Sequence, residues 1–215
     1  MLKRSLPDDG LNPYIALSDL AINVVVILVF FVAAILTAGQ ISREKEVVRY
    51  KNAQGAVKDA VGRAALSVRP LILEPSLRND PPGVQRWVFR GRDTRGKRMF
   101  LSSNPLDLRS SQLTDSGRSY LLKFAQVLRN SESRWRRIRI EGHTLAPKNN
   151  QKESWGLSAR RAATVADLFA NEGRIQPNKL AVAARGGQTP FNGKGGRAND
   201  PVNERVEIVI EYAEK

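Results

Sequence analysis

The sequence predicts an α+β protein, in which a single N-terminal transmembrane helix is followed by a mixed-sheet domain covered by helices. Residues 14–38 are almost entirely apolar, although 26% of the whole chain is charged. Behind them, strand-like and helix-like patterns alternate in the order strand, helix, strand, helix, strand, which favours helices packed on a mixed sheet. The chain of 215 residues is long enough for one ordinary domain and an appendage.

Residues 14–38 are predicted to form the transmembrane helix, preceded by a short cytoplasmic tail over residues 1–13. The apolar stretch has 25 residues and one charge, Asp19. At about 1.5 Å per residue, a helix of this length crosses a hydrocarbon core of about 30 Å. A cleavable signal peptide is the alternative, which the long apolar run and the acidic pair Asp8 and Asp9 disfavour.

Asp19 calls for an explanation, because an ionisable group in a membrane span is costly and usually faces a protein interior or an ion pathway. Asn23 follows at i+4 on the same helical face, and Ser18 is adjacent, so the three form a narrow polar stripe. The other interpretation is that the span begins at Leu20 and that Asp19 is its N-cap. On the local sequence alone, the two interpretations are even.

Residues 39–80 are predicted to form a helical linker, because apolar residues such as Val57 and Val61 recur at helical spacing. Gly55 and Gly62 weaken this helix, so a hinge or a second short helix is the alternative.

The globular domain is predicted to occupy residues 81–215, since the Asp-Pro-Pro-Gly sequence at residues 80–83 is a strong helix and strand breaker. Two strand-like segments, residues 87–89 and 99–101, flank a turn-rich stretch and predict a hairpin.

The remaining elements follow from capping and periodicity. Thr114 and Asp115 are candidate N-caps for a helix with one apolar side. Ile138 and Ile140 alternate with charged residues and predict a strand. Residues 157–169 repeat helically, and the alternating residues 206–210 predict the last strand.

Composition excludes several kinds of site. The chain has no cysteine, which excludes disulfides, thiolate metal sites and cysteine nucleophiles, and one histidine, His143, which excludes a multi-histidine metal site. No paired carboxylates, nucleophile set or phosphate loop stands out. We therefore expect a protein that is not an enzyme and that has neither a cofactor nor a metal site.

The positive charge lies behind the apolar stretch. The chain has a net charge of +14; residues 41–215 hold 33 Lys and Arg against 18 Asp and Glu. Such a surface favours polyanions, whether nucleic acid, anionic lipid or an anionic cell-envelope polymer. Residues 134–140 interleave an aromatic residue with arginines, and we favour a half-buried strand with solvated arginines over a nucleic-acid patch. The cations after the span favour a cytoplasmic C-terminus, but long domains translocate largely regardless of charge.

Four motifs stand in a family order. They are Glu141-Gly142-His143-Thr144, Leu157-Ser158-Ala159-Arg160-Arg161-Ala162, Gly196-Arg197-Ala198 and Asn203-Glu204-Arg205-Val206-Glu207-Ile208. Together they resemble the OmpA-like peptidoglycan-binding domain over residues 98–213, which implies a βαβαβ fold. The sequence Tyr14–Leu20 resembles the Ser-Asp-Leu motif that begins the single span of MotB-type stator subunits and of ZorB, the related subunit of the Zorya anti-phage system.

The resemblance implies an ion-driven rotary stator in the bacterial inner membrane. A homodimer of this chain would stand inside a ring of five MotA-like or ZorA-like multispan subunits. The N-terminus would be cytoplasmic and the C-terminal domain periplasmic. Asp19 matches the family's proton-carrying aspartate, with Ser18 and Asn23 as supporting pore residues, and residues 42–66 are a candidate plug of the ion path. Losing its charge on protonation would let Asp19 move against the partner ring.

The resemblance also assigns peptidoglycan binding to Thr144, Arg161 and Arg205. Arg161 stands at the family position that pairs with the ligand carboxylate, a role that suits a guanidinium. Leu145 replaces the family aspartate that recognises diaminopimelate, and Ser154 replaces a family asparagine, so the wall-binding half departs from the pattern.

The short connector and compact tail favour a ZorB-like role over a flagellar MotB-like one. A passive OmpA-like envelope tether without ion transport is the alternative from another class. A third hypothesis is a membrane protein whose basic domain lies in the cytoplasm and binds nucleic acid. We do not favour it and therefore expect no nucleic-acid partner.

Overall fold

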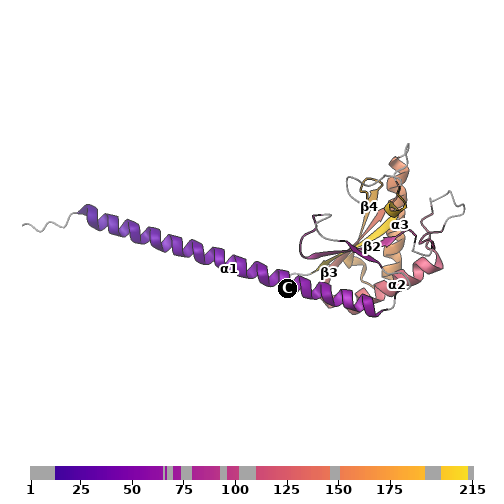
Figure 1. Ribbon diagram of the computed structural model, residues 1–215, viewed down its shortest axis with the longest axis horizontal. Helices are drawn as coiled ribbons and strands as arrows, with labels where there is room; N and C mark the ends of the chain where they lie inside the picture. Colours follow the sequence, from indigo (N-terminus) through magenta and orange to yellow (C-terminus); the bar gives the residue numbers. More distant parts are fainter. Residues whose placement is uncertain are drawn as a thin grey trace, which may run out of the picture. The chain divides into compact units, whose positions relative to one another are not determined.

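The computed structural model describes residues 13–64, 66, 70–73, 79–92, 96–101, 110–145, 151–191 and 200–212. The chain divides into two compact units, Met1–Glu46 and Val47–Lys215. Helix α1, Pro13–Arg63, runs from the first unit into the second (Figure 1).

Helix α1 is long and apolar enough to cross a membrane, and none of the residues of its most apolar window is buried in the isolated chain. It continues through Gly55 and Gly62, as the predicted helical extension requires, and the alternative of a hinge or a second short helix is wrong. Each glycine costs a helix about 1 kcal/mol relative to alanine. The nearby Val57 and Val61 are buried in the core of the second unit, and this burial offsets that cost.

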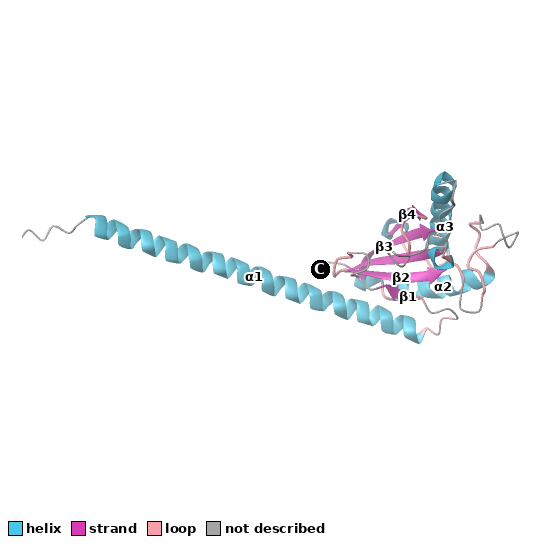
Figure 2. Ribbon diagram, turned by 45° about the horizontal axis from the view of Figure 1, so that its top comes forward, coloured by secondary structure: helices cyan, strands magenta, loops and turns pink. Residues whose placement is uncertain are grey.

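The second unit contains one five-stranded sheet with the strand order β1-β2-β5-β3-β4 (Figure 2). The strands are β1 Leu71–Leu73, β2 Val84–Arg90, β3 Trp135–His143, β4 Leu180–Gly186 and β5 Arg205–Tyr212. The helices are α2 Asp115–Asn130 and α3 Gln151–Asn171, with short 3-10 turns at Glu132–Arg134, Pro177–Lys179 and Pro201–Asn203. Strands β3 and β4 are parallel and the other pairs are antiparallel, so the predicted mixed sheet after an apolar helix is confirmed.

The predicted hairpin between residues 87–89 and 99–101 is wrong. Strand β2 pairs with β1 and with β5, which comes from the far end of the sequence. The second arm makes only the isolated bridges Arg92↔Arg98 and Phe100↔Leu113 among the described residues. Met99 and Phe100 are buried in the core, so their apolar pattern reflects packing rather than a strand.

Two strands were missed by the sequence patterns. Strand β4 is rich in alanine, a residue depleted in strands, and β1 has only three residues. The N-cap prediction is confirmed, because Thr114 Oγ1 accepts a hydrogen bond of 2.9 Å from the backbone N–H of Gly117 at the start of α2.

The hydrophobic core lies on the side of the sheet that the helices cover. Alternate strand residues point into it, among them Phe89, Ile140 and Ile208, which are each 0% exposed. The ring of Phe89 makes an edge contact with Phe124 of α2, with centroids 5.0 Å apart. The other alternate residues of β3 and β5 therefore point to the opposite face of the sheet.

At Gly142 of β3, the backbone of α3 lies very close to the strand. A Cβ at this position would overlap the backbone carbonyl oxygen of Ser158. We expect Gly142→Ala to destabilise the domain by about 1–3 kcal/mol, because the helix must move away from the strand. Urea unfolding followed by tryptophan fluorescence measures the change.

Gly55 of α1 provides the matched control, since a Cβ there would meet no atom within 4 Å outside the helix's own backbone. We expect Gly55→Ala to be neutral or to stabilise by about 0.5–1 kcal/mol. Equal effects of the two substitutions would contradict the close approach of α3.

Candidate functional site

The three residues predicted to bind peptidoglycan lie at one end of the sheet. Thr144 follows β3 directly, and Arg205 is the first residue of β5. Arg205 pairs across the ladder with His143, the neighbour of Thr144. Arg161 lies on α3, which packs against β3 and β4. The carboxyl end of β3, the start of β5 and α3 thus form the candidate site.

Arg161 is held by this chain's own groups and is only 2% exposed. Its guanidinium forms an ion pair of 2.8 Å with Glu204, and its Nε donates a hydrogen bond of 3.0 Å to the carbonyl of Ser110. The guanidinium carbon lies 4.6 Å from the centre of the Phe100 ring. Burial lowers the pKa of Arg161, and the carboxylate of Glu204 opposes this shift.

Thr144 is also buried and is engaged with α3. Its hydroxyl oxygen lies 2.8 Å from the hydroxyl oxygen of Ser154, and its backbone N–H donates to the carbonyl of Gly186 at 3.0 Å. Ser154, which stands where the family has an asparagine, thus contacts the predicted site residue Thr144 directly. Leu145, the next residue in the chain, is half-buried.

Arg205 fixes the polar end of β5. Its Nε donates a hydrogen bond of 2.6 Å to Glu207, and its two terminal nitrogens donate to the carbonyls of Asn203 and Thr189. The side chain of Arg205 is 0% exposed, so in this conformation it is engaged by the chain's own groups, as that of Arg161 is.

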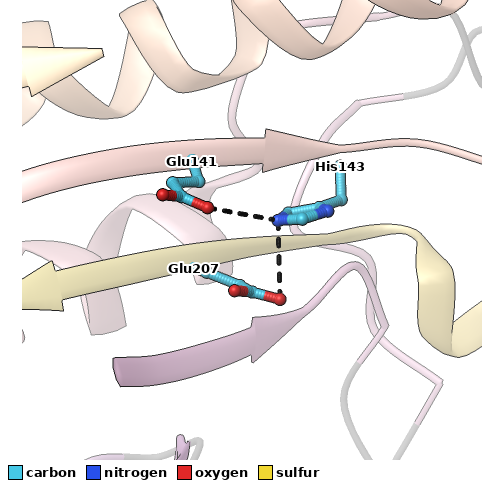
Figure 3. A group of neighbouring side chains, drawn as sticks. All are labelled: Glu141, His143 and Glu207. Atoms are coloured by element: carbon cyan, nitrogen blue, oxygen red, sulfur yellow. Dashed lines mark ion pairs between the residues drawn. The ribbon is translucent and has the colours of Figure 1, made fainter. Parts of the chain in front are cut away.

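Beside this site, the sheet face opposite the helices contains a buried charge network that sequence reasoning missed. Glu141 of β3 and Glu207 of β5 are direct cross-strand partners. Their two negative charges repel each other unless nearby cations compensate them. One terminal nitrogen of Arg86 bridges the two carboxylates at 3.0 and 2.8 Å. His143 Nε2 lies 3.4 Å from Glu207 and 3.9 Å from Glu141. Figure 3 shows the imidazole ring directed towards both carboxylates.

The signal for this network was the charge at alternate strand positions. Arg137, Arg139, Glu141 and His143 share one face of β3, where solvated arginines were expected. Arg137 pairs with Glu211, and Arg139 pairs with both Glu141 and Glu211. Their side chains remain 43% and 30% exposed, so the prediction of a half-buried strand with solvated arginines is confirmed, and the ion pairs are what the sequence did not reveal.

Glu141, His143 and Glu207 offer one ligand atom each within 4.8 Å of one another, a spacing that a metal site would also have. The carboxylate oxygens already accept hydrogen bonds from arginines. The donors are Arg86, Arg139, Arg185 and Arg205. A divalent cation would stand among these guanidinium groups and would be repelled by them. This donor set does not fit a metal ion.

The charge network predicts acid sensitivity. Burial tends to raise the pKa of Glu141, but hydrogen bonds from Arg185, the charge of Arg86 and a hydrogen bond from Arg139 lower it to about 2. The ordinary pKa is 4.5, so this ionised carboxylate stabilises the fold above that pH. Its contribution of about 3 kcal/mol is lost as the pH falls from about 4.5 towards 2.

Urea unfolding at about pH 7 and about pH 3 measures this loss. We expect the free energy of unfolding to fall on acidification in the unchanged chain and to fall less in Glu141→Gln, which cannot ionise. An equal fall in both proteins would show that Glu141 does not cause the acid sensitivity.

The structure places the predicted ion-carrying residue inside α1. The helix begins at Pro13, so Asp19 lies beyond the first turn, and the N-cap interpretation is wrong. Ser18 donates its hydroxyl hydrogen to the carbonyl of Tyr14 at 2.8 Å. The side chains of Asp19 and Asn23 are exposed in the isolated chain and lie one helical turn apart.

Comparison with known proteins identifies the domain. Residues 107–204 match the model of the OmpA family. A MotB-like protein from Desulfovibrio vulgaris has a similar structure, with a TM-score of 0.57, 16% identity and coverage of 78% of this chain and 96% of that one. The domain has an OmpA-like fold.

Two further structures resemble the OmpA-like domain. The periplasmic domain of MotB has a TM-score of 0.49, 19% identity and coverage of 67% of this chain and 69% of that one. The cell wall anchor of the T6SS from Pseudomonas aeruginosa has a TM-score of 0.49, 21% identity and coverage of 67% and 89%. No curated protein matches the chain.

Proposed function

We propose that this chain is the B-type subunit of a proton-driven rotary stator complex in the bacterial inner membrane. The observation that carries the proposal is a carboxylate, Asp19, inside an apolar helix that could cross a membrane. Asp19 does not cap this helix, and the same chain contains an OmpA-like domain. An intramembrane carboxylate is costly unless it faces a protein interior or an ion path. The likeness to solved MotB-type domains supports the same role.

In this proposal, Asp19 takes up a proton from one side of the membrane and releases it to the other. Protonation removes its charge and allows movement against a ring of MotA-like or ZorA-like partner chains. Ser18 and Asn23 supply polar groups beside it. Two copies of this chain stand inside a ring of five partners, with the N-terminus cytoplasmic.

The OmpA-like domain lies in the periplasm and holds the complex to peptidoglycan. Thr144, Arg161 and Arg205 form the wall-binding end of the domain. Because Leu145 cannot provide a counter-charge to an ammonium group, recognition rests on the carboxylates of the peptide stem and on the positive charge of the domain.

The absence of cysteine makes the orientation directly testable. Arg136→Cys places one thiol on an exposed position of β3, and Ser5→Cys places one in the N-terminal tail. A membrane-impermeant maleimide added to intact spheroplasts should label the first variant, whereas the second should react only after permeabilisation. The reverse pattern would overturn the proposal and favour a cytoplasmic domain.

We further propose that the complex is the ZorB-like component of an anti-phage system rather than a flagellar stator. The short residue 39–80 segment supports this choice, since residues 47–63 already belong to the unit that contains the domain. Phage-plating and swimming assays on a deletion strain separate the two roles. Loss of swimming with unchanged phage resistance would favour the flagellar role.

A further inference from the structure

We propose that Glu204 is an internal competitor for the wall ligand and keeps the wall-binding site in a closed, low-affinity state. This inference rests on the proposed binding of peptidoglycan. The starting point is the Arg161–Glu204 ion pair of 2.8 Å, in which both side chains are at most 10% exposed. The carboxylate of Glu204 occupies the position on the guanidinium that a ligand carboxylate needs.

Two further contacts of Arg161 restrict how a ligand carboxylate can approach its guanidinium. Its Nε donates to the carbonyl of Ser110, and the Phe100 ring lies against the guanidinium. A guanidinium presents its donors in one fixed plane, so a bidentate carboxylate needs two neighbouring nitrogens of that plane. In the described structure, one of these nitrogens is paired with Glu204.

Glu204 is held beside Arg161 by its backbone. Its carbonyl accepts a hydrogen bond of 2.6 Å from the N–H of Gly91, and its own N–H donates to the carbonyl of Pro201 at 3.2 Å. A Cβ on Gly91 would lie 2.7 Å from both the Cγ and the backbone oxygen of Glu204, so only glycine allows this approach. The end of β2 therefore fixes the competing carboxylate in place.

Displacement has an energetic consequence. A ligand carboxylate replaces one charge-assisted contact of Arg161 with an equivalent one, but it leaves Glu204 buried without its cation. An unpaired buried charge is strongly unfavourable. Binding therefore remains weak unless Glu204 is neutralised or moves into solvent, and any event that moves the start of β5 away from β2 opens the site.

The test is the affinity of full-length chain in detergent for purified sacculi, measured by co-sedimentation, and for a soluble muropeptide with a free peptide carboxylate. We expect Glu204→Gln to bind both at least about tenfold more tightly than the unchanged chain, since it removes the competing charge. The double variant, which combines Glu204→Gln with Arg161→Met, should lose the gain in muropeptide affinity that Glu204→Gln shows alone.

Glu172→Gln is the matched control for general charge. Glu172 forms an exposed ion pair with Arg118, so this variant removes one negative charge from the protein without touching the site. It should change the affinity by less than about twofold. A gain as large as that of Glu204→Gln would overturn the inference, because it would reflect only stronger attraction to an anionic polymer.

Each outcome decides one of the two proposals. Equal muropeptide affinity of the unchanged chain and Glu204→Gln overturns the competitor role and leaves wall binding intact. Absence of sacculus binding by every variant overturns both wall binding and the inference. If Glu204→Gln does not fold, Glu204→Asp replaces it in the test, because the shorter side chain retains the charge but withdraws it from Arg161. Tighter muropeptide binding by Glu204→Asp than by the unchanged chain then supports the inference, and equal binding overturns it.

Discussion

Asp19→Asn is expected to abolish ion flow and motor function while leaving membrane insertion and assembly with the partner ring intact. Asparagine has nearly the same size as aspartate but cannot take up and release a proton at physiological pH. Asp19 is an interior residue of α1 rather than its cap, so the substitution removes no helix-terminal hydrogen bond. Proton uptake by inverted vesicles and the phage-plating or swimming assay should both fall to background.

Two further substitutions at Asp19 separate ion transport from a passive tether. Asp19→Glu keeps a titratable carboxylate and should retain part of the proton flow. Asp19→Ser keeps a hydrogen-bonding side chain without a carboxylate and should be as inactive as the asparagine variant. Full activity of the serine or asparagine variant would remove the proton-carrying mechanism and favour the tether.

Asn23→Ala provides the control one turn along the same helical face. It removes a polar side chain that does not titrate. We expect reduced but measurable proton flow, since the stator proposal gives Asn23 a supporting role in the path and leaves the ion to Asp19. A loss as complete as that of Asp19→Asn would show that the whole polar stripe, rather than one carboxylate, is required.

Arg86→Met is expected to destabilise the OmpA-like domain by about 3–5 kcal/mol, because it leaves Glu141 and Glu207 facing each other with less compensation. Burial alone would lower the pKa of Arg86, but its hydrogen bond to Asp80 and the charges of Glu141 and Glu207 raise it overall. The residue thus stays charged in a buried setting. Urea unfolding followed by tryptophan fluorescence measures the loss.

Arg118→Met is the matched control for Arg86→Met. Arg118 pairs with Glu172 on the surface, where their side chains are 57% and 36% exposed. Such pairs contribute at most about 1 kcal/mol, so we expect a small change. Similar losses in the two variants would contradict the structural importance of the buried network.

The structure constrains the plug hypothesis for residues 42–66. Tyr50, Val57 and Val61 are buried in the core of the second unit. A plug made from this segment would have to withdraw these side chains from the core before its apolar side could enter an ion path. The described conformation therefore assigns this apolar side to the domain.

Local patterns predicted much of the fold because they depend on nearby residues. The capping residue Thr114, the apolar alternation around Ile138 and the long apolar helix each follow from neighbours in sequence. The hairpin failed for the opposite reason. The choice of β5 as the partner of β2 depends on residues more than a hundred positions away, which no local pattern encodes.

The charge network was missed for the same reason. Arg86 and Glu207 are 121 positions apart, so their 2.8 Å hydrogen bond is visible only once the strands are ordered. Similarly, the family position of Arg161 gave no indication that Glu204 would pair with it. The motif predicted which residues form the candidate site, and the packing determined which of their groups are already engaged.

The most direct test of the stator proposal is the native mass of the complex purified from its own membranes in mild detergent. The proposal predicts two copies of this chain bound to five copies of a larger multispan protein. A lone chain, or a homodimer with no membrane partner, would contradict it and would leave the passive envelope tether as the better account.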